Sequence, residues 1–251
     1  MNSEALFAQT VKRLRTARHL VVFTGAGISA QSGISTFRDP STGLWARYDP
    51  KELATPAAFA KDPALVWAWY SWRRTLVNEA QPNAAHLAVA RLAQCLPLVT
   101  IITQNVDDLL ERAGSKEVIH LHGDLASARC FQCNRPYLGP LPVGVGEDCD
   151  SLEPPRCAHC NGQVRPNVVW FGEGMPEQEL DQAFTAARDC DVMLSIGTSG
   201  NVYPAARIPT LAAEHGAWLV HINIESIGAA SDKTLVGDAT QWLPRLVDAF
   251  A

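Results

Sequence analysis

The sequence contains no long hydrophobic run and only a modest share of charge. Its 251 residues include 21 Lys and Arg against 26 Asp and Glu, a formal net charge of −5. No apolar stretch approaches membrane-spanning length, and the N-terminus lacks the continuous apolar segment of a secretory signal. A mildly acidic chain also disfavours a polyanion as the main partner. We therefore expect a globular protein of the cytoplasm that binds neither membranes nor, directly, nucleic acid.

The sequence also lacks the usual dinucleotide fingerprint. The apolar run at residues 19–24 ends in Gly25-Ala26-Gly27, but the next glycine is Gly33, six residues on instead of three. Because glycine has no Cβ, such a turn lets backbone N–H groups approach a phosphate closely. Two interpretations remain open for this loop alone: a strand leading into a dinucleotide site, or a glycine-rich turn after a buried strand.

Beyond this loop, apolar segments of helical and strand type alternate along the chain. Helices are expected at residues 63–79, 83–94, 177–188 and 241–250, and strands at 96–103, 117–121, 168–171, 191–196 and 218–224. This alternation is typical of an α/β protein whose mostly parallel sheet is covered by helices on both faces. In such a Rossmann-like fold the ligand lies at the carboxyl ends of the strands.

Two segments interrupt the alternation. Residues 39–83 hold four of the seven tryptophans and read as a helical insertion. Residues 124–167 are rich in proline, which excludes long helices, and are expected to form a smaller zinc-binding part. The remaining residues, about 1–38, 84–123 and 168–251, would form the Rossmann-like part.

Zinc is predicted from the cysteines. Four of the seven form two Cys-x-x-Cys pairs: Cys130, Cys133, Cys157 and Cys160. Two such pairs can supply four thiolates in a tetrahedron, and a reducing compartment disfavours disulfides, so we predict one structural zinc ion with a closed coordination shell. His159 in place of one cysteine is the alternative ligand. The other three are expected to be small buried hydrophobes: Cys95, Cys149 and Cys190.

Together the short motifs resemble the sirtuin family of NAD-dependent protein-lysine deacylases over essentially the whole chain. The matching segments are the Gly25 loop with Phe37-Arg38-Asp39, Thr103 to Asp107, His120 to Gly123, the cysteine pairs, Val169 to Glu173, Gly197 to Ser199 and Asn223 to Glu225. The resemblance implies NAD as co-substrate and acyl-lysine proteins or peptides as partners. The products it implies are nicotinamide, O-acyl-ADP-ribose and free lysine.

The resemblance also assigns roles to individual residues. His122 matches the general base that acts on the ribose hydroxyls, a role that suits a histidine because its ordinary pKa is near neutrality. Asn105 and Asp107 are grouped with it as catalytic because they orient the nicotinamide ribose. Val169 and Phe171 match the segment that pairs with the substrate peptide. The residues matched to NAD are Gly25, Ala26, Gly27, Phe37, Arg38, Gln104, Asn105, Asp107, Gly197, Thr198, Ser199, Asn223, Glu225 and Ala239.

One helical pair bears on the acyl group. Tyr70 and Arg73 are three residues apart, so on a helix a phenol and a guanidinium can converge on one carboxylate. This pair resembles the desuccinylase and demalonylase branch of the family. The alternative is a tyrosine packed among aromatic residues with a surface arginine.

Two other functions remain open at this point. An activated ribose could instead be captured by a protein nucleophile, which would make the chain an NAD-dependent protein ADP-ribosyltransferase. The chain could also be a non-catalytic, NAD-responsive binding module that uses its zinc segment for recognition. The presence of His122 with Asn105 and Asp107 argues against the binding module.

Overall fold

The computed structural model describes residues 2–35, 48–227 and 233–250, and Phe37 and Arg38 therefore lie outside the described residues. The helices are α1 (Ser3–Leu14), α2 (Pro50–Leu53), α3 (Pro56–Lys61), α4 (Pro63–Glu79), α5 (Ala84–Cys95), α6 (Leu109–Arg112), α7 (Glu177–Asp189), α8 (Arg207–Glu214) and α9 (Ala239–Phe250), with the 3₁₀ turns η1 (Ala26–Ile28) and η2 (Ala30–Ser32). The strands are β1 (His19–Thr24), β2 (Leu98–Thr103), β3 (Ile119–His120), β4 (Gly123–Cys130), β5 (Pro136–Tyr137), β6 (Val164–Val168), β7 (Val192–Ile196), β8 (Trp218–Asn223) and β9 (Thr234–Val236).

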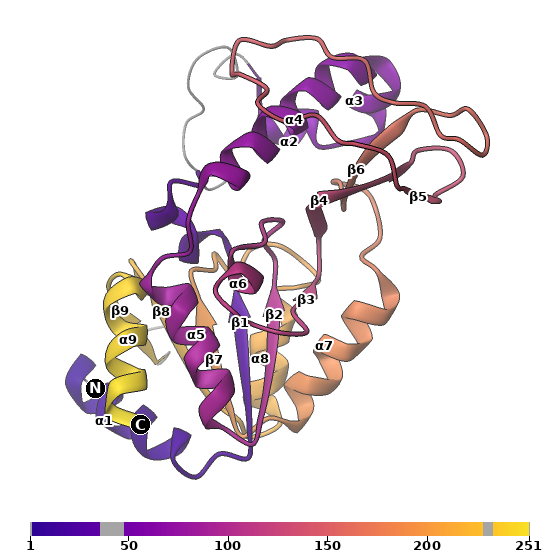
Figure 1. Ribbon diagram of the computed structural model, residues 1–251. Coiled ribbons are helices and arrows are strands. Elements are labelled where there is room, and N and C mark those ends of the chain that lie inside the picture. Colours follow the sequence, from indigo (N-terminus) through magenta and orange to yellow (C-terminus); the bar gives the residue numbers. More distant parts are fainter. Residues whose placement is uncertain (1, 36–47, 228–232, 251) are drawn as a thin grey trace.

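Six parallel strands form the larger sheet, in the order β3-β2-β1-β7-β8-β9 (Figure 1). From β1 the chain builds outward to β2 and β3 on one side, and later it returns to place β7 on the other side. The strand order therefore reverses between β1 and β7, which is where ligands bind in open sheets of this kind. The prediction of an α/β fold with a Rossmann-like parallel sheet is confirmed.

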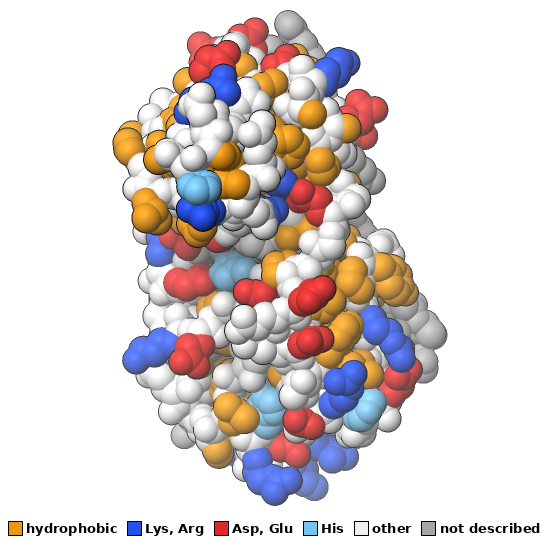
Figure 2. Space-filling model, turned by 90° about the vertical axis from the view of Figure 1, so that its right-hand side faces the viewer, with side chains coloured by type: hydrophobic (Ala, Val, Ile, Leu, Met, Phe, Trp, Pro, Cys, Tyr) orange, Lys and Arg blue, Asp and Glu red, His pale blue; other side chains and the backbone are white. Residues whose placement is uncertain are grey.

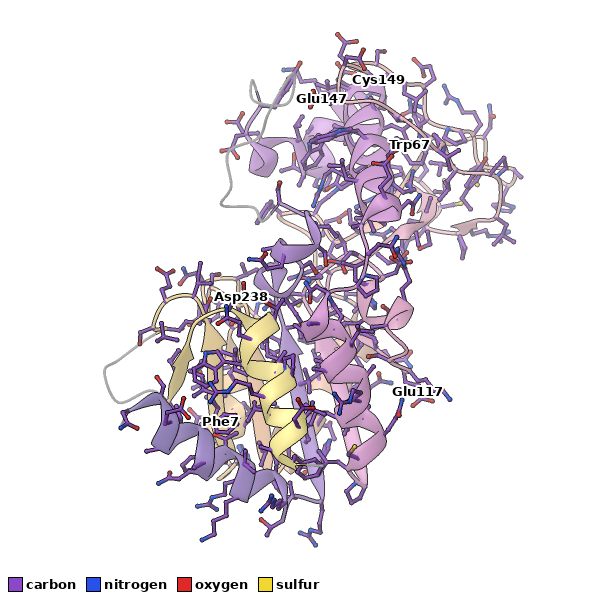
Figure 3. The ribbon with its side chains drawn as sticks, turned by 60° about the vertical axis from the view of Figure 1, so that its left-hand side comes forward. Phe7, Trp67, Glu117, Glu147, Cys149 and Asp238 are labelled. Atoms are coloured by element: carbon purple, nitrogen blue, oxygen red, sulfur yellow. The ribbon has the colours of Figure 1, made fainter. Side chains whose placement is uncertain are left out.

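Helices cover both faces of this sheet, and β1 is buried along its whole length. Leu20 and Val22 belong to the core that α1, α5 and α9 cover, whereas Val21 and Phe23 belong to the core under α7 and α8. Alternate residues of a strand point to opposite faces, which explains the continuous apolar run. Phe7 of α1 faces α9 (Figure 3), and none of the described helices is both long and apolar enough to cross a membrane.

A second, antiparallel sheet in the order β5-β4-β6 lies above the first, beside α2, α3 and α4 (Figure 1). The strand expected at residues 168–171 is wrong, since β6 spans Val164–Val168 and ends where that strand was expected to begin. Pro166, one of the prolines expected to exclude long helices here, lies within β6. It is tolerated because β6 pairs only with β4 and therefore lies at an edge of the sheet.

Among the other strands, the largest differences from the expected boundaries are at β2 and β3. The strand expected at residues 96–103 begins at Leu98, and the one expected at 117–121 is reduced to β3. Glu117 has a φ of 54°, in the left-handed region, which is incompatible with a strand at that point. The proposed domain boundaries within the chain stay a prediction.

The segment between β5 and β6 runs over α4, with Trp67 beneath the part that carries Cys149 (Figure 3). Leu152 of this segment packs against the cluster formed by Trp67, Ala128 and Val164. Among the cysteines outside the pairs, Cys190 is buried as expected, but Cys149 is partly exposed and Cys95 is exposed. The expectation that all three are buried is therefore wrong. Cys149 lies in a surface loop and Cys95 is the last residue of α5, and neither place requires a small side chain to be buried.

Candidate active site

Three glycines bring the loops after β1 and β7 into backbone contact. The N–H of Gly27 donates to the Gly197 carbonyl at 2.9 Å, and the N–H of Gly25 donates to Ile196 at 2.9 Å. A Cβ at Gly25 would lie 2.8 Å from the Gly197 oxygen, and one at Gly27 would lie 2.7 Å from its Cα, so neither position accepts a larger residue. The glycines are thus required by the contact between the loops, and two N–H donors that we expected to face a phosphate are already engaged. Ala26 lies between them at the start of η1.

His122 lies between β3 and β4, at the junction of the two sheets. Its Nδ1 is 2.9 Å from the carbonyl oxygen of Gln104. Because a carbonyl oxygen can only accept, Nδ1 carries the hydrogen, and Nε2 of the neutral ring keeps its lone pair. Burial lowers the pKa of His122, although the hydrogen bond to Gln104 partly opposes this. The ring is therefore neutral at physiological pH and presents Nε2 as a base.

A buried hydrogen-bond network centred on Ser29 holds Asn105 and Asp107. Ser29 Oγ donates to Asp107 Oδ2 at 3.0 Å and accepts from Asn105 Nδ2 at 3.1 Å. His86 Nε2 lies 3.3 Å from Ser29 Oγ. The Nδ1 of His86 accepts from the N–H of Asn83, which places the ring hydrogen on Nε2. Burial raises the pKa of Asp107, and its hydrogen bonds partly oppose this. The network fixes both side chains at the carboxyl end of β2.

The remaining residues expected to bind NAD gather at the carboxyl ends of β7 and β8. The carbonyl of buried Thr198 accepts from Asn223 Nδ2 at 3.0 Å, which ties the two loops together. Ser199 follows in the β7 loop, and Glu225 is exposed just beyond β8. Ala239 is buried at the start of α9, which packs against η1. These positions and the Gly25 loop therefore share one edge of the sheet.

The segment after β6 is fixed by a buried ion pair. Both Nη atoms of Arg165 donate to the Glu173 carboxylate, with 2.9 Å between Nη2 and Oε2, and Nη2 also donates to the Val168 carbonyl. The Arg165 Cζ lies 3.3 Å from the centre of the Trp170 ring, and Glu173 accepts from the Trp170 N–H at 2.8 Å. Burial would raise the pKa of Glu173, but Arg165 lowers it below its ordinary value.

Replacing Arg165 with methionine should lower the free energy of unfolding by about 3 kcal/mol, because the partly buried Glu173 would lose both hydrogen bonds from Arg165 and keep only the more distant Arg129, 3.8 Å away, as a cation. Denaturant unfolding measures this loss. Arg207→Met is the matched control, since it breaks an exposed pair with Glu214 at 2.7 Å that solvent screens, so its loss should be much smaller. Equal losses in the two variants would contradict the structural importance of the Arg165 pair.

Val169 and Phe171 flank Trp170, and both of their backbone N–H groups are engaged. Val169 donates to the His122 carbonyl at 2.8 Å, and Phe171 donates to the Ala54 carbonyl at 2.9 Å. A peptide that paired with Val169 or Phe171 would therefore have to donate an N–H to the carbonyl oxygen of that residue. The role of the two residues in binding a substrate peptide stays a prediction.

Helix α4 places Tyr70 and Arg73 side by side next to Trp170. Tyr70 Oη accepts from Trp170 Nε1 at 2.9 Å and keeps its own O–H as a donor. Burial raises the pKa of Tyr70 to about 12, so the phenol is neutral. The Arg73 Cζ lies 5.8 Å from the Tyr70 ring centre and 5.0 Å from that of Trp69. Burial lowers the pKa of Arg73, while Tyr70 and Asp107 partly oppose this.

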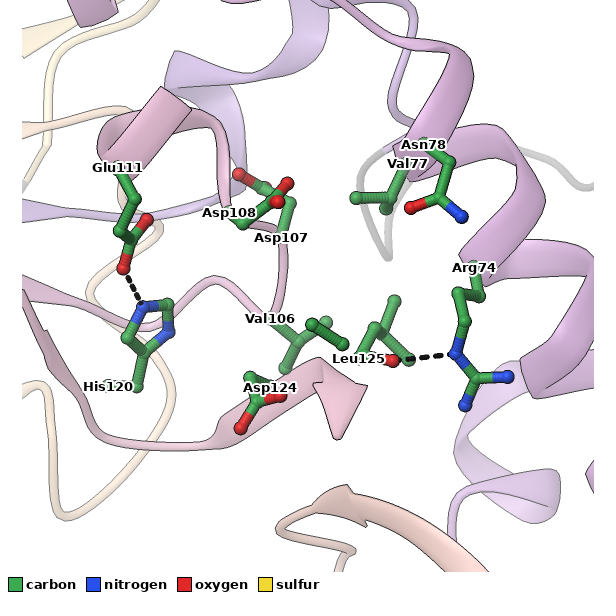
Figure 4. Close-up of a pocket in the computed structure, with 11 residues that line it drawn as sticks. Arg74, Val77, Asn78, Val106, Asp107, Asp108, Glu111, His120, Asp124 and Leu125 are labelled. Atoms are coloured by element: carbon green, nitrogen blue, oxygen red, sulfur yellow. Dashed lines mark hydrogen bonds and ion pairs between the residues drawn. The ribbon is translucent and has the colours of Figure 1, made fainter. Parts of the chain in front are cut away.

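A cavity of about 270 Å³ lies between α4, α6 and β4. Figure 2 shows the molecule narrowed between its upper and lower parts, with a histidine and acidic side chains facing the hollow. Figure 4 shows the cavity itself. The titratable side chains that line it are Arg74, Asp107, Asp108, Glu111, His120 and Asp124.

The four paired cysteines form one cluster, and their sulfur atoms all lie within 4.8 Å of one another. Cys130 and Cys160 are 3.5 Å apart at sulfur, and Cys133 and Cys157 are 3.7 Å apart. Zinc–sulfur bonds of about 2.3 Å in a tetrahedron give sulfur–sulfur edges of about 3.8 Å, so the cluster fits one structural zinc ion. Backbone N–H groups lower the pKa of Cys157 to about 6, which favours the thiolate. The exposed His159 is not part of the cluster, and the alternative ligand set is wrong.

The site combines the neutral His122, a hydrogen-bond network at the end of β2 and a glycine-lined point at which the strand order reverses. The four-cysteine cluster lies at the far end of β4. A model of the Sir2 family matches residues 25–204. The chain belongs to the Sir2 family, the sirtuins. Its Sir2 relatives include NAD-dependent protein deacylase 1 of Pseudomonas aeruginosa, 57% identical over 94% of this chain and 96% of the relative. The NAD-dependent protein deacylase of Methylococcus capsulatus is 52% identical over 94% of each chain.

Solved Sir2 structures are similar over nearly the whole chain. A crystal structure of a Sir2 homologue–NAD complex has a TM-score of 0.87 and 43% identity, covering 97% of this chain and 93% of that one. A Sir2–p53 peptide–NAD⁺ structure has a TM-score of 0.81 and 31% identity, covering 96% of each chain. The family resemblance predicted from the motifs is confirmed.

Sequence reasoning missed Ser29 and His86 as parts of this Sir2 site. Ser29 belonged to the glycine-loop motif but received no role. His86 lies 57 residues away in the sequence and forms a capping box with Asn83, a pattern that signals the start of a helix and not a site. Only the fold brings the two side chains together.

Proposed function

We propose that this Sir2 protein is an NAD-dependent protein-lysine deacylase whose acyl site takes succinyl and malonyl groups as well as acetyl. NAD-dependent protein deacylation agrees with the names of its relatives and with the NAD complex of a similar structure. The preference for acidic acyl groups rests on Tyr70 and Arg73. The expected products are nicotinamide, O-acyl-ADP-ribose and free lysine.

One run of contacts from the base to the acyl site carries this proposal. The His122 carbonyl accepts from Val169, and the next residue, Trp170, donates its indole N–H to Tyr70. The Tyr70 ring in turn faces Arg73. An acyl-lysine that reaches His122 would therefore bring the distal end of its acyl group toward the phenol and the guanidinium.

The protein's own groups would bind and orient both substrates. When bound, NAD supplies the ribose that receives the acyl group and the nicotinamide that departs. The loops at the carboxyl ends of β1, β7 and β8 would hold it, with Glu225 on ribose hydroxyls as in other dinucleotide sites. Asn105 and Asp107 would hold the nicotinamide ribose beside His122, whose Nε2 takes a proton from a ribose hydroxyl.

A carboxylate at the end of the acyl group suits the environment of Tyr70 and Arg73. Arg73 lies over two aromatic rings, where little water competes for its N–H donors, and the neutral Tyr70 adds a hydroxyl donor. Charge-assisted hydrogen bonds of this kind are worth roughly 1.5–3 kcal/mol each. Acetyl-lysine has no carboxylate and would gain little from them.

Arg73→Met is expected to lower kcat/KM for a succinyl-lysine peptide by about 10²-fold or more and to change deacetylation by only a few fold. Methionine is similar in length but uncharged, so the variant removes the carboxylate contact. Tyr70→Phe is a poorer test, because it would also leave the buried Trp170 N–H without its acceptor. The measurement is mass spectrometry of the deacylated peptide and of the ADP-ribose product, for peptides that differ only in the acyl group.

Arg91→Met is the matched control, since Arg91 lies on α5 and its side chain is 53% exposed. It should leave both activities unchanged. Equal losses on both peptides in Arg73→Met would show that Arg73 is structural, and no loss would show that the carboxylate binds elsewhere. With NAD labelled in the adenosine part, label retained on protein instead of in O-acyl-ADP-ribose would favour ADP-ribosyl transfer.

We place the protein in the cytoplasm. The four clustered cysteines can bind zinc only as thiolates, and a reducing compartment keeps them so. Fractionation of cells that produce the protein would test this placement.

A further inference from the structure

His120 lies two residues before the proposed base and makes hydrogen bonds with both of its ring nitrogens. Its Nδ1 is 3.2 Å from the carbonyl oxygen of Asn105, and its Nε2 is 2.6 Å from Glu111 Oε1. Glu111 belongs to α6, and Asn105 belongs to the loop that joins β2 to α6. The imidazole therefore ties the beginning of this loop to the helix that follows it. Figure 4 shows the contact between His120 and Glu111.

The two partners of His120 determine its protonation. A carbonyl oxygen can only accept, and an ionised carboxylate can only accept, so both ring nitrogens must donate. His120 is then an imidazolium. A neutral imidazole beside an ionised Glu111 would keep the charge-assisted bond and turn its Nδ1 lone pair toward the Asn105 oxygen.

The surroundings favour the charged ring. Burial alone would lower the pKa of His120, but the hydrogen bond and charge of Glu111, with the Asn105 carbonyl and the Asp124 carboxylate, raise it above its ordinary value. The acidic groups that face this region come from α6, from β4 and from the loop that carries Asp107 and Asp108.

The nearest cations on the neighbouring helices belong to α4 and α6. Arg74 of α4 lies at the far side of the cavity and donates to the Leu125 carbonyl at 2.7 Å. Arg112 of α6 pairs with Asp108 at 3.5 Å. Neither of these hydrogen bonds involves His120, and the acidic groups outnumber the two arginines.

We propose that His120 is a positioning residue for the NAD site: as an imidazolium it anchors the Asn105 carbonyl to Glu111, and its loss of a proton at alkaline pH releases the loop that carries Asn105 and Asp107. The inference rests on the proposed role of these two residues in binding NAD. It gives the two neighbouring histidines opposite requirements, because His122 must be neutral to act as a base and His120 must be charged to hold the loop.

The pH dependence follows from the two shifts. Burial lowers the pKa of His122, so the base becomes available below the ordinary histidine pKa of about 6.5. The raised pKa of His120 keeps its anchor fully present at and below that pH, and the anchor is lost as the pH rises through the raised value. The enzyme should therefore work best between the pKa of His122 and the pKa of His120. Its loss of activity at alkaline pH should reflect weaker NAD binding.

Calorimetric titration of the zinc-loaded protein with NAD alone, at a series of pH values, tests the proposal without turnover. Wild-type affinity should fall about tenfold between about pH 7 and about pH 9.5, the effect of losing one hydrogen bond to a charged group. His120→Gln should bind more weakly at neutral pH and lose this alkaline limb. Glu111→Gln keeps a hydrogen-bond acceptor but no charge. In this variant the alkaline fall in NAD affinity should therefore occur at a pH lower by about one unit or more.

His215→Gln is the control, because His215 is exposed after α8, and its pH profile should match that of the wild type. Nitrogen-15 NMR of the histidine rings, assigned with His120→Gln, should show His120 charged and His122 neutral at about pH 7. A neutral His120 at that pH, or the same alkaline limb in His120→Gln as in wild type, would overturn the proposal. Unchanged NAD affinity in Asn105→Ala would overturn the proposed NAD site. The protonation state of His120 would not be affected by that outcome, because NMR reports it separately.

Discussion

Replacing His122 with tyrosine should lower kcat/KM for deacylation by about 10²–10⁴-fold, the usual contribution of a general base. The hydrogen bond from Nδ1 to the Gln104 carbonyl leaves Nε2 as the proton acceptor, and burial keeps the ring neutral. A tyrosine has no basic atom at neutral pH and cannot take this role. Initial rates with acyl-lysine peptide and saturating NAD measure the loss.

The same experiment distinguishes a lost base from a lost fold. His122→Tyr should keep its zinc and its far-ultraviolet circular dichroism, because its side chain makes one hydrogen bond to a backbone carbonyl and takes no part in the cysteine cluster. His215→Tyr, at the exposed end of α8, should retain wild-type rates. Turnover of the His122 variant at the wild-type rate would contradict the assignment of the base.

The acid side of the pH profile provides a second check on His122. Because the group must be deprotonated to act, activity should appear as the pH rises through its pKa, which burial places below the ordinary value of about 6.5. An acid limb above that value in kcat/KM would mean that another group is titrating.

Local signals predicted the parts of the fold that local physics determines. The helix expected at residues 63–79 is α4 with the same ends, since Asp62 caps it by accepting from Leu65 and Pro63 suits its first turn. The apolar run before Gly25 is buried on both faces and forms the centre of the parallel sheet. Such features depend on neighbours within a few residues.

Contacts between distant segments could not be predicted in this way. From the sequence alone, the glycines at 25 and 27 fit either a phosphate site or a turn after a buried strand, whereas the structure shows that they lie against the backbone of Gly197, about 170 residues later. The buried pair of Arg165 and Glu173 likewise depends on the turn after β6, which sequence patterns described as a strand. In both cases the deciding neighbour is fixed by tertiary packing, which overrides local preference.

Tyr70 and Arg73 of α4 depend both on local spacing and on contacts with distant residues. Their spacing correctly predicted that the two side chains meet, because residues three apart share a helical face. The spacing could not show that Trp170 donates to Tyr70 or that Trp69 lies under Arg73. The Trp170 contact leaves the Tyr70 O–H as a donor, burial keeps the phenol neutral, and the rings lie under the cation. The proposed acyl preference depends on these conditions.

Removing zinc should have the other large effect, because the zinc-binding segment has little core of its own. Strand β5 has two residues, and the long connection from β5 to β6 packs mainly on α4. Zinc binding to four thiolates contributes apparent free energies of about 10–16 kcal/mol in small zinc-finger peptides, far more than typical domain contacts. Cys157→Ala should therefore release the metal and unfold residues 131–163.

The loss should extend to catalysis, because β4 joins the cysteine cluster to the segment that carries His122. Gly123, the first residue of β4, follows His122 directly, and Cys130 ends the strand. We expect Cys157→Ala, or wild type treated with a strong chelator, to lose essentially all deacylation together with its zinc, as measured by metal analysis and activity on the same samples. Cys95→Ala, which changes an exposed cysteine outside the cluster, should keep both. A zinc-free Cys157→Ala protein with full activity would show that the cluster is dispensable for positioning His122.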